Sequence, residues 1–249
     1  MPRFFTPQHL SPASTLELDA SAARHVQVLR MQPGDTITLF NGLGETEGEY
    51  TAVVQAMGRS NVSVMVGSFV NTQSEPARQV HIAIGMPAND RMDWLVEKAT
   101  ELGVASIAPL MTERSVLRLS GERQAKKLAH WRGIAIAASE QCGRSRVPLI
   151  CEPASLGAYL KLCGASAVPE HSVRLLLSLQ AGAKSLPEYG AVHQNFTLLS
   201  GPEGGLSRLE EAAASAAGFA GLNLGSRVLR SETAPLAVLS YLQMLPLRV

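Results

Sequence analysis

From residue 76 onward, short apolar runs alternate with segments in which apolar residues recur every three or four positions. The runs have the length of buried strands, and the helical spacing between them is typical of helices that cover a sheet. Alternation of this kind predicts an α/β domain built on a parallel sheet. The predicted strands cover residues 80–85, 106–110, 173–179, 196–199 and 221–224, and the predicted helices cover residues 90–102, 121–141, 156–162 and a segment that starts near 232.

The first part of the chain follows a different pattern, in which β-forming residues cluster in short segments separated by turn signals. Asp19 precedes a stretch that can form a helix, and an aspartate is well suited to cap it. Residues 71–76 are polar and end in proline, as a linker does. The sequence therefore predicts a β-rich domain over residues 1–72 and the α/β domain over residues 73–249. The β-rich segments are residues 36–40, 46–55 and 61–66.

Composition narrows the class of protein. With 46% hydrophobic and 17% charged residues, the chain of 249 residues predicts ordered domains with real cores. No apolar run approaches the roughly 18 residues that span a bilayer, and the first residues lack the apolar core of a signal peptide. The three cysteines and six histidines are not spaced as metal ligands. We therefore expect a cytoplasmic protein with reduced thiols, without a membrane segment and without a metal.

The net charge of +1 does not suggest a nucleic-acid partner, but the distribution of charge does. Between residues 114 and 146 the chain has eight basic residues and only two glutamates. A patch of this kind can bind phosphates, although a solvated helix face has the same composition. Arg114, Arg144 and Arg146 lie next to turn residues outside the predicted helix, which favours contact with RNA. Arg3 and Arg30 are further candidates, for which surface or capping roles fit equally well.

Two glycine-bearing turns follow predicted strands in the last fifth of the chain. The first is GPEGG at residues 201–205, after which Ser207 and Glu210 have the spacing of a capping box. The second covers residues 225–233 and carries two arginines, a glutamate and a threonine, which a simple reversal does not need. Open α/β sheets bind ligands at the carboxyl ends of their strands. Neither turn has the Rossmann glycine fingerprint or a Walker lysine, so we do not expect a dinucleotide or a nucleoside triphosphate.

At these turns the chain resembles the bacterial ribosomal RNA small subunit methyltransferase E family, which belongs to the SPOUT methyltransferases. Two departures are noted: Ser231 stands where most relatives have threonine, and Ala88-Asn89 stands where many have lysine-glycine. The resemblance weakens at residues 151–173 and 181–194. The segments that carry it are LLSGPEGGLS (198–207), LGSRVLRSETAPL (224–236), residues 90–116, residues 134–148 and the opening MPRFF.

The resemblance implies an enzyme that transfers a methyl group from S-adenosylmethionine (SAM) to N3 of a uridine in 16S rRNA of the small ribosomal subunit. It also implies a deep trefoil knot in the C-terminal domain, an N-terminal PUA-like β-barrel that binds RNA, and a homodimer. Three loops of such enzymes wrap the cofactor. Carried onto this chain, the cofactor-binding residues are Ser178, Leu179, Gln180, Leu199, Ser200, Gly201, Pro202, Gly204, Gly205, Leu224, Gly225, Val228, Leu229 and Ala234.

The chemistry of the acceptor suggests the catalytic residues. N3 of uridine carries a proton and cannot attack until that proton leaves, which requires a base or cations that stabilise the anion on O2 and O4. Arg230 and Arg114 are the candidates for that stabilisation. Glu203 is a possible base or an anchor for an arginine, whereas Glu232 is favoured as a helix-start carboxylate.

Three other functions compete with this interpretation. The same cofactor loops could serve methylation of another rRNA or tRNA base. An RNA-binding ribosome-assembly factor without catalysis would share the fold, although the intact glycines and Arg230 argue against it. A nucleotide hydrolase built on GPEGG would need a lysine and a metal-binding carboxylate that the turn lacks.

Overall fold

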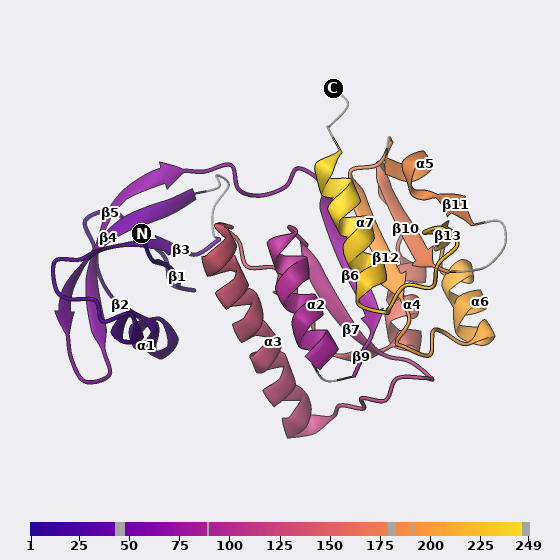
Figure 1. Cartoon of the computed structure of the whole chain (residues 1–249), viewed down its shortest axis with the longest axis horizontal. Helices are drawn as coiled ribbons and strands as arrows, with labels where there is room; N and C mark the ends of the chain where they lie inside the picture. Colours follow the sequence, from indigo (N-terminus) through magenta and orange to yellow (C-terminus); the bar gives the residue numbers. More distant parts are fainter. Residues whose placement is uncertain (43–47, 89, 179–182, 191, 246–249) are drawn as a thin grey trace. The chain divides into compact units, whose positions relative to one another are not determined.

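The computed structural model describes residues 1–42, 48–88, 90–178, 183–190 and 192–245 (Figure 1). The chain forms two compact units. Unit 1 comprises Met1–Glu75 together with Ile136–Val147, and unit 2 comprises Pro76–Ala135 together with Pro148–Val249. The end of the long helix and the turn after it therefore group with the N-terminal residues, although they lie far away in the sequence.

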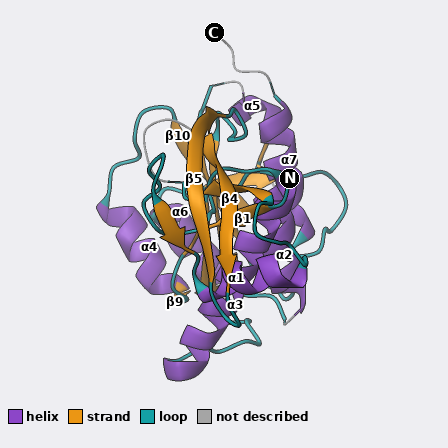
Figure 2. Cartoon of the chain, turned by 90° about the vertical axis from the view of Figure 1, so that its left-hand side faces the viewer, coloured by secondary structure: helices purple, strands orange, loops and turns teal. Residues whose placement is uncertain are grey.

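Unit 1 contains a five-stranded sheet, one helix of its own and the end of the long helix that begins in unit 2. Its strand order is β1-β3-β4-β5-β2, in which β1 pairs parallel with β3 and the other pairs are antiparallel. Figure 2 shows β4 and β5 as long neighbouring strands. Alternate residues of β5 are buried in the core, and Asp19 caps α1 by accepting hydrogen bonds from two backbone amides. The elements are β1 Arg3–Phe5, β2 Thr15–Glu17, α1 Ala20–Val28, β3 Thr36–Phe40, β4 Gly48–Met57 and β5 Val62–Asn71.

Unit 2 is built on a parallel sheet of order β11-β13-β10-β12-β6-β7-β8, with β9 also paired to β7. Every strand pair in it is parallel, and the buried positions of the middle strands are mainly apolar, as expected for strands covered on both faces. The α/β class with a parallel sheet predicted from the sequence is confirmed. The strands are β6 Gln79–Gly85, β7 Ser106–Met111, β8 Leu149–Ile150, β9 Ala154–Ser155, β10 Ser172–Leu177, β11 Lys184–Ser185, β12 Asn195–Ser200 and β13 Ala220–Asn223.

Helices cover both faces of this sheet. In Figure 1, α2 and α7 lie in front of it and contact each other. On the other face, Leu176 and Leu199 of the strands pack with Leu156 and Leu160 of α4 and with Ala214 of α6. The helices are α2 Asp90–Glu101, α3 Gly121–Cys142, α4 Leu156–Ala165, α5 Leu186–Gly190, α6 Arg208–Ala216 and α7 Thr233–Met244. Among the residues that the structure describes, no helix is long and apolar enough to cross a membrane.

Candidate active site

A cavity of about 510 Å³ opens at the carboxyl ends of β10, β12 and β13. Its volume lies within the roughly 300–1,000 Å³ typical of small-molecule sites. Both glycine-bearing turns contribute to its wall, which is the arrangement expected at the C-terminal edge of a parallel sheet. The lining residues are Arg91, Leu177, Ser178, Ser200, Gly201, Pro202, Glu203, Gly204, Gly205, Leu206, Glu211, Leu222, Leu224, Arg227, Val228, Leu229, Arg230, Ser231 and Ala234.

The first turn, named here the glycine loop (residues 201–206), is folded so tightly that a side chain at Gly201 would not fit. A Cβ atom on Gly201 would lie 2.7 Å from the carbonyl carbon of Gly205 and 2.7 Å from the amide nitrogen of Leu206. Gly205 has a φ of +69°, which favours glycine, and its amide donates to the carbonyl of Pro202 at 2.8 Å. The loop therefore presents its backbone to the cavity.

The helix that follows the glycine loop is capped as the sequence predicts. Ser207 and Glu210 form a reciprocal capping box at the start of α6. Glu210 Oε1 also accepts a hydrogen bond at 2.7 Å from the backbone amide of Glu113, in the turn after β7. One carboxylate thus joins the start of α6 to a neighbouring loop.

Arg114, in the turn after β7, supports the glycine loop from outside the cavity. Its Nη1 donates to the carbonyl of Gly204 at 2.7 Å and lies 3.5 Å from the carbonyl of Leu206. Its aliphatic stem lies against Gly204, where an added Cβ atom would come within 3.3 Å of it. Arg114 is not among the lining residues of the cavity. Its guanidinium is directed at backbone carbonyls of the glycine loop, which it supports, and the catalytic role expected from the sequence stays a prediction.

The second turn, named here the arginine turn (residues 224–232), joins β13 to α7. Gly225 has a φ of +100° and its amide donates to Asn223 Oδ1 at 2.6 Å, which begins the reversal. At the other end, the carbonyl of Arg230 accepts from the amides of Thr233 at 3.0 Å and Ala234 at 3.1 Å, so the backbone passes directly into the helix. The side chain of Arg230 lies at the cavity wall and is exposed.

Two carboxylates beside the cavity share one arginine. Glu203 Oε1 accepts a hydrogen bond from the amide of Ala88 at 2.9 Å and lies 3.6 Å from Nη1 of Arg91. Glu232 is buried, its Oε2 accepts from the Ser231 hydroxyl at 3.0 Å, and its Oε1 lies 4.0 Å from Nε of Arg91. Glu232 occupies the N-cap position of α7, which agrees with the helix-start position favoured from the sequence, although its side chain makes no capping hydrogen bond.

Most residues expected to bind the cofactor do line the cavity. Leu199 does not: it is fully buried, and its side chain packs toward α4 and α6. Gly225 shapes the arginine turn without lining the cavity. Leu179 and Gln180 lie outside the described residues. Those that line it are Ser178, Ser200, Gly201, Pro202, Gly204, Gly205, Leu224, Val228, Leu229 and Ala234.

Several lining residues were missed by reasoning from the sequence. Arg91 and Glu211 lie on helices, where charged residues usually face solvent, and no spacing rule distinguishes them from ordinary surface residues. Arg91 does fall within the DRMDW segment, one of those that carry the family resemblance, and that was the available signal. The lining residues absent from the expected set are Arg91, Leu177, Leu206, Glu211, Leu222, Arg227 and Ser231.

Comparison with known proteins places this geometry in a family. Residues 18–65 match the RNA methyltransferase PUA domain, and residues 73–243 match the RNA methyltransferase domain. The chain is 31% identical to ribosomal RNA small subunit methyltransferase E of Bacillus subtilis, over 96% of this chain and 95% of that protein. This chain belongs to the ribosomal RNA small subunit methyltransferase E family.

Solved structures agree with membership of this methyltransferase family. Ribosomal RNA small subunit methyltransferase E of Neisseria gonorrhoeae is 33% identical with a TM-score of 0.86, and the match covers 98% of this chain and 97% of that one. A methyltransferase of Legionella pneumophila is 37% identical with a TM-score of 0.88, covering 97% and 96%. Both of those proteins were solved with SAM bound.

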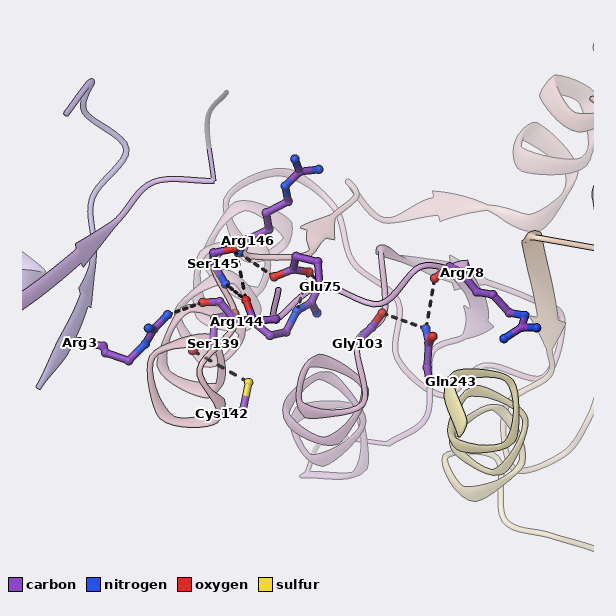
Figure 3. Close-up of polar contacts among 11 residues, drawn as sticks. Arg3, Glu75, Arg78, Gly103, Ser139, Cys142, Arg144, Ser145, Arg146 and Gln243 are labelled. Atoms are coloured by element: carbon purple, nitrogen blue, oxygen red, sulfur yellow. Dashed lines mark hydrogen bonds and ion pairs between the residues drawn. The ribbon is translucent and has the colours of Figure 1, made fainter. Parts of the chain in front are cut away.

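The arginines expected to bind RNA differ in how accessible they are (Figure 3). The Arg144 side chain is 7% exposed and pairs with Glu75, with Nη2 at 2.7 Å and Nε at 3.1 Å from Oε2. Arg3 donates to Glu49 and, at 2.8 Å, to the carbonyl of Arg144. These contacts tie both side chains to other residues of unit 1, and the RNA-binding role expected for Arg3 and Arg144 stays a prediction.

Arg146 and Arg30 remain accessible on unit 1. The backbone amide of Arg146 donates to Glu75 Oε1 at 3.0 Å, while its side chain is exposed and points away from Glu75 in Figure 3. Arg30 is exposed and has a φ of +56° at the end of the turn after α1. Both can meet a phosphate without breaking an internal ion pair. Within the described ranges, no group of three or more histidine, cysteine, aspartate or glutamate side chains could hold a metal ion.

Proposed function

We propose that this chain is a SAM-dependent methyltransferase that modifies N3 of a uridine in 16S rRNA of the small ribosomal subunit. The observation that carries the proposal is the cavity at the carboxyl ends of three adjacent parallel strands, walled by two glycine-bearing turns. Two solved structures similar over nearly their whole length hold SAM, and a curated relative is named for its action on small-subunit rRNA.

The cavity residues fit SAM in size and chemistry. Leucines at its wall offer apolar surface to an adenine ring, and the glycine loop lets backbone groups approach a ligand closely. Ser178 and Glu211 add polar atoms, with the Ser178 hydroxyl 3.4 Å from Glu211 Oε1. When bound, SAM supplies a methyl group activated by a positively charged sulfur. The leucines at the wall are Leu177, Leu206, Leu222, Leu224 and Leu229.

Arg230 is the residue to which we assign stabilisation of the acceptor. Loss of the N3 proton leaves negative charge on O2 and O4 of the uracil ring, and a guanidinium offers several fixed donors to those atoms. Its exposed position at the cavity wall leaves it available for such a contact. For Glu203, bonds to the Ala88 amide and to Arg91 favour the anchoring role over that of a base.

The proposal extends to the rest of the molecule. We assign RNA binding to the domain over residues 1–72, including Arg30, together with Arg146, and methyl transfer to the domain over residues 73–249. A homodimer is the assembly that the family resemblance implies. Because ribosomal subunits assemble in the bacterial cytoplasm, the substrate implies a cytoplasmic enzyme.

Nucleoside analysis of 16S rRNA from cells tests this function. A strain that lacks the protein should lose one 3-methyluridine from its 16S rRNA, and expression of the wild-type chain should restore it. The Arg230→Ala variant, expressed at the same level, should not restore it. Unchanged 3-methyluridine in the deletion strain would refute the proposed substrate.

A further inference from the structure

Arg91 lies where three segments of unit 2 meet. It belongs to the first turn of α2, and its guanidinium lies 3.6 Å from Glu203 in the glycine loop and 4.0 Å from Glu232 at the start of α7. Glu203 in turn accepts a hydrogen bond from the amide of Ala88, just before α2. One side chain thus spans the two turns that wall the cavity.

Of the two carboxylates, Glu232 at the start of α7 is the more buried and has the greater need of a compensating charge. The side chain of Glu232 is 7% exposed, whereas those of Glu203 and Arg91 are 32% and 39% exposed. A buried carboxylate is costly unless hydrogen bonds and a cation compensate it. The Ser231 hydroxyl supplies one hydrogen bond, and the guanidinium of Arg91 lies 4.0 Å from the carboxylate.

This pairing also bears on Arg230. Arg230 and Glu232 belong to the same short turn, and the carbonyl of Arg230 accepts the first amides of α7. A shift of Glu232 would therefore move the backbone that carries Arg230. A shift of Glu203 would move the glycine loop at the same time.

We propose that Arg91 is a positioning residue for methyl transfer, which acts through Glu203 and Glu232 to fix the glycine loop relative to the turn that carries Arg230. This inference rests on the proposed function of the cavity. A planar guanidinium can face two carboxylates at once. The ammonium group of a lysine is less suited to this arrangement. The other possible role for Arg91, direct contact with an RNA phosphate, is an outcome of the test below.

A double-mutant cycle in the full chain tests the inference, with kcat measured at saturating SAM and small ribosomal subunits. We expect Arg91→Gln and Glu232→Gln each to lower kcat about tenfold. The kcat of the double variant should lie no more than about twofold below that of the less active single variant, because the effects of residues that act as a unit are not additive. Arg91→Lys should recover part of the loss. As a control, Lys98→Gln removes a cation from the same helix. Lys98 pairs with Glu97 and Glu101 of α2, so this change should alter kcat less than about twofold.

Urea unfolding of the same variants without SAM gives a readout that does not depend on activity. Arg91 and Glu232 should be coupled in the free energy of unfolding, and Lys98 and Glu232 should not. Losses in kcat that multiply in the double variant would overturn the proposal. An unchanged kcat with a raised KM for the subunits would also overturn it, because it would indicate contact with RNA. Coupling in the free energy of unfolding without any effect on kcat would overturn it as well. A wild-type chain that transfers no methyl group would refute the proposed function instead.

Discussion

The arginines around the cavity differ in what each guanidinium meets. Arg114 donates to backbone carbonyls of the glycine loop, and Arg91 lies between two carboxylates. Within the part of the chain that the structure describes, the Arg230 side chain makes no hydrogen bond or ion pair, although it lines the cavity. A cation at a cavity wall without such a partner is free to interact with a ligand. Replacement of the three arginines should therefore affect different steps of binding and catalysis.

Replacement of Arg230 should affect chemistry far more than cofactor binding. We expect Arg230→Ala to lower kcat by about 100-fold or more, the loss typical of removing a donor that stabilises developing negative charge. The affinity for SAM, measured by calorimetry, should stay within a few-fold because the glycine loop is untouched. Normal methylation by this variant would show that the central catalytic assignment is wrong.

Replacement of Arg114 should have the opposite profile. Arg114→Ala removes charged donors from the carbonyls of Gly204 and Leu206 and loosens the loop that forms the cavity wall. We expect the Kd for SAM to rise about tenfold or more, because the roughly 1.5–3 kcal/mol of a hydrogen bond to a charged group corresponds to about 10- to 150-fold. At saturating SAM, kcat should stay within a few-fold of wild type. A variant that binds SAM normally but has lost kcat would restore the catalytic role expected from the sequence.

At the scale of elements, the glycine loop owes its shape to two different constraints. Gly201 is required by space, because an added Cβ atom would meet backbone atoms at 2.7 Å. Gly205 is required by conformation alone, because its φ is +69° and an added Cβ atom would meet nothing within 4 Å. Substitutions at the two positions therefore separate a steric effect from a conformational one.

We expect Gly201→Ala to abolish detectable SAM binding, since the loop must open to accommodate the methyl group. Gly205→Ala should instead lower the free energy of unfolding by about 1–2 kcal/mol, the cost of a left-handed conformation for an L-residue, with SAM binding changed only modestly. Calorimetry with SAM and urea unfolding of the same two variants provide the comparison. Equal effects of both variants on SAM binding would contradict this explanation of the loop.

Strongly patterned elements could be predicted from the sequence. The apolar strands of unit 2 and the capping box of α6 are close to where the sequence predicts them, because apolar runs and local hydrogen bonds are encoded by neighbouring residues. The short elements β1, β2, β8, β9, β11 and α5 were not predicted, since two to five residues carry too little pattern. That the side chain of Leu199 packs away from the cavity could not be predicted, because the strand pattern shows which residues share a face but not which face the cavity adjoins.

At the scale of the whole molecule, the composition of unit 1 could not be predicted from the sequence. Residues 136–147 join it because Arg144 pairs with Glu75, 69 residues earlier, and because Glu140 accepts a hydrogen bond from the amide of Phe5. Local pattern reveals neither partner. A basic segment beside glycine looks equally suited to bind RNA or to bury an ion pair, and only the fold distinguishes Arg144 from Arg146.

The two neighbouring arginines therefore give a matched test of RNA binding. We expect Arg146→Ala to weaken binding to small ribosomal subunits and to reduce the salt dependence of the binding constant by about one phosphate contact. Arg144→Ala should leave that salt dependence unchanged but lower the free energy of unfolding by about 3 kcal/mol, because it leaves Glu75 buried without its cation. Filter binding across a salt series and urea unfolding provide the two readouts. A reduced salt slope for Arg144→Ala would contradict the structural role assigned to it.

The central claim is that this chain moves a methyl group from SAM to N3 of a uridine in the small ribosomal subunit. Its most direct test is transfer of labelled methyl from SAM by the purified chain to small subunits from a strain that lacks it, followed by nucleoside analysis. The account predicts that the label is recovered as 3-methyluridine. Label in a different nucleoside would keep the enzyme class and refute the substrate, and no label together with no SAM binding would contradict the account as a whole.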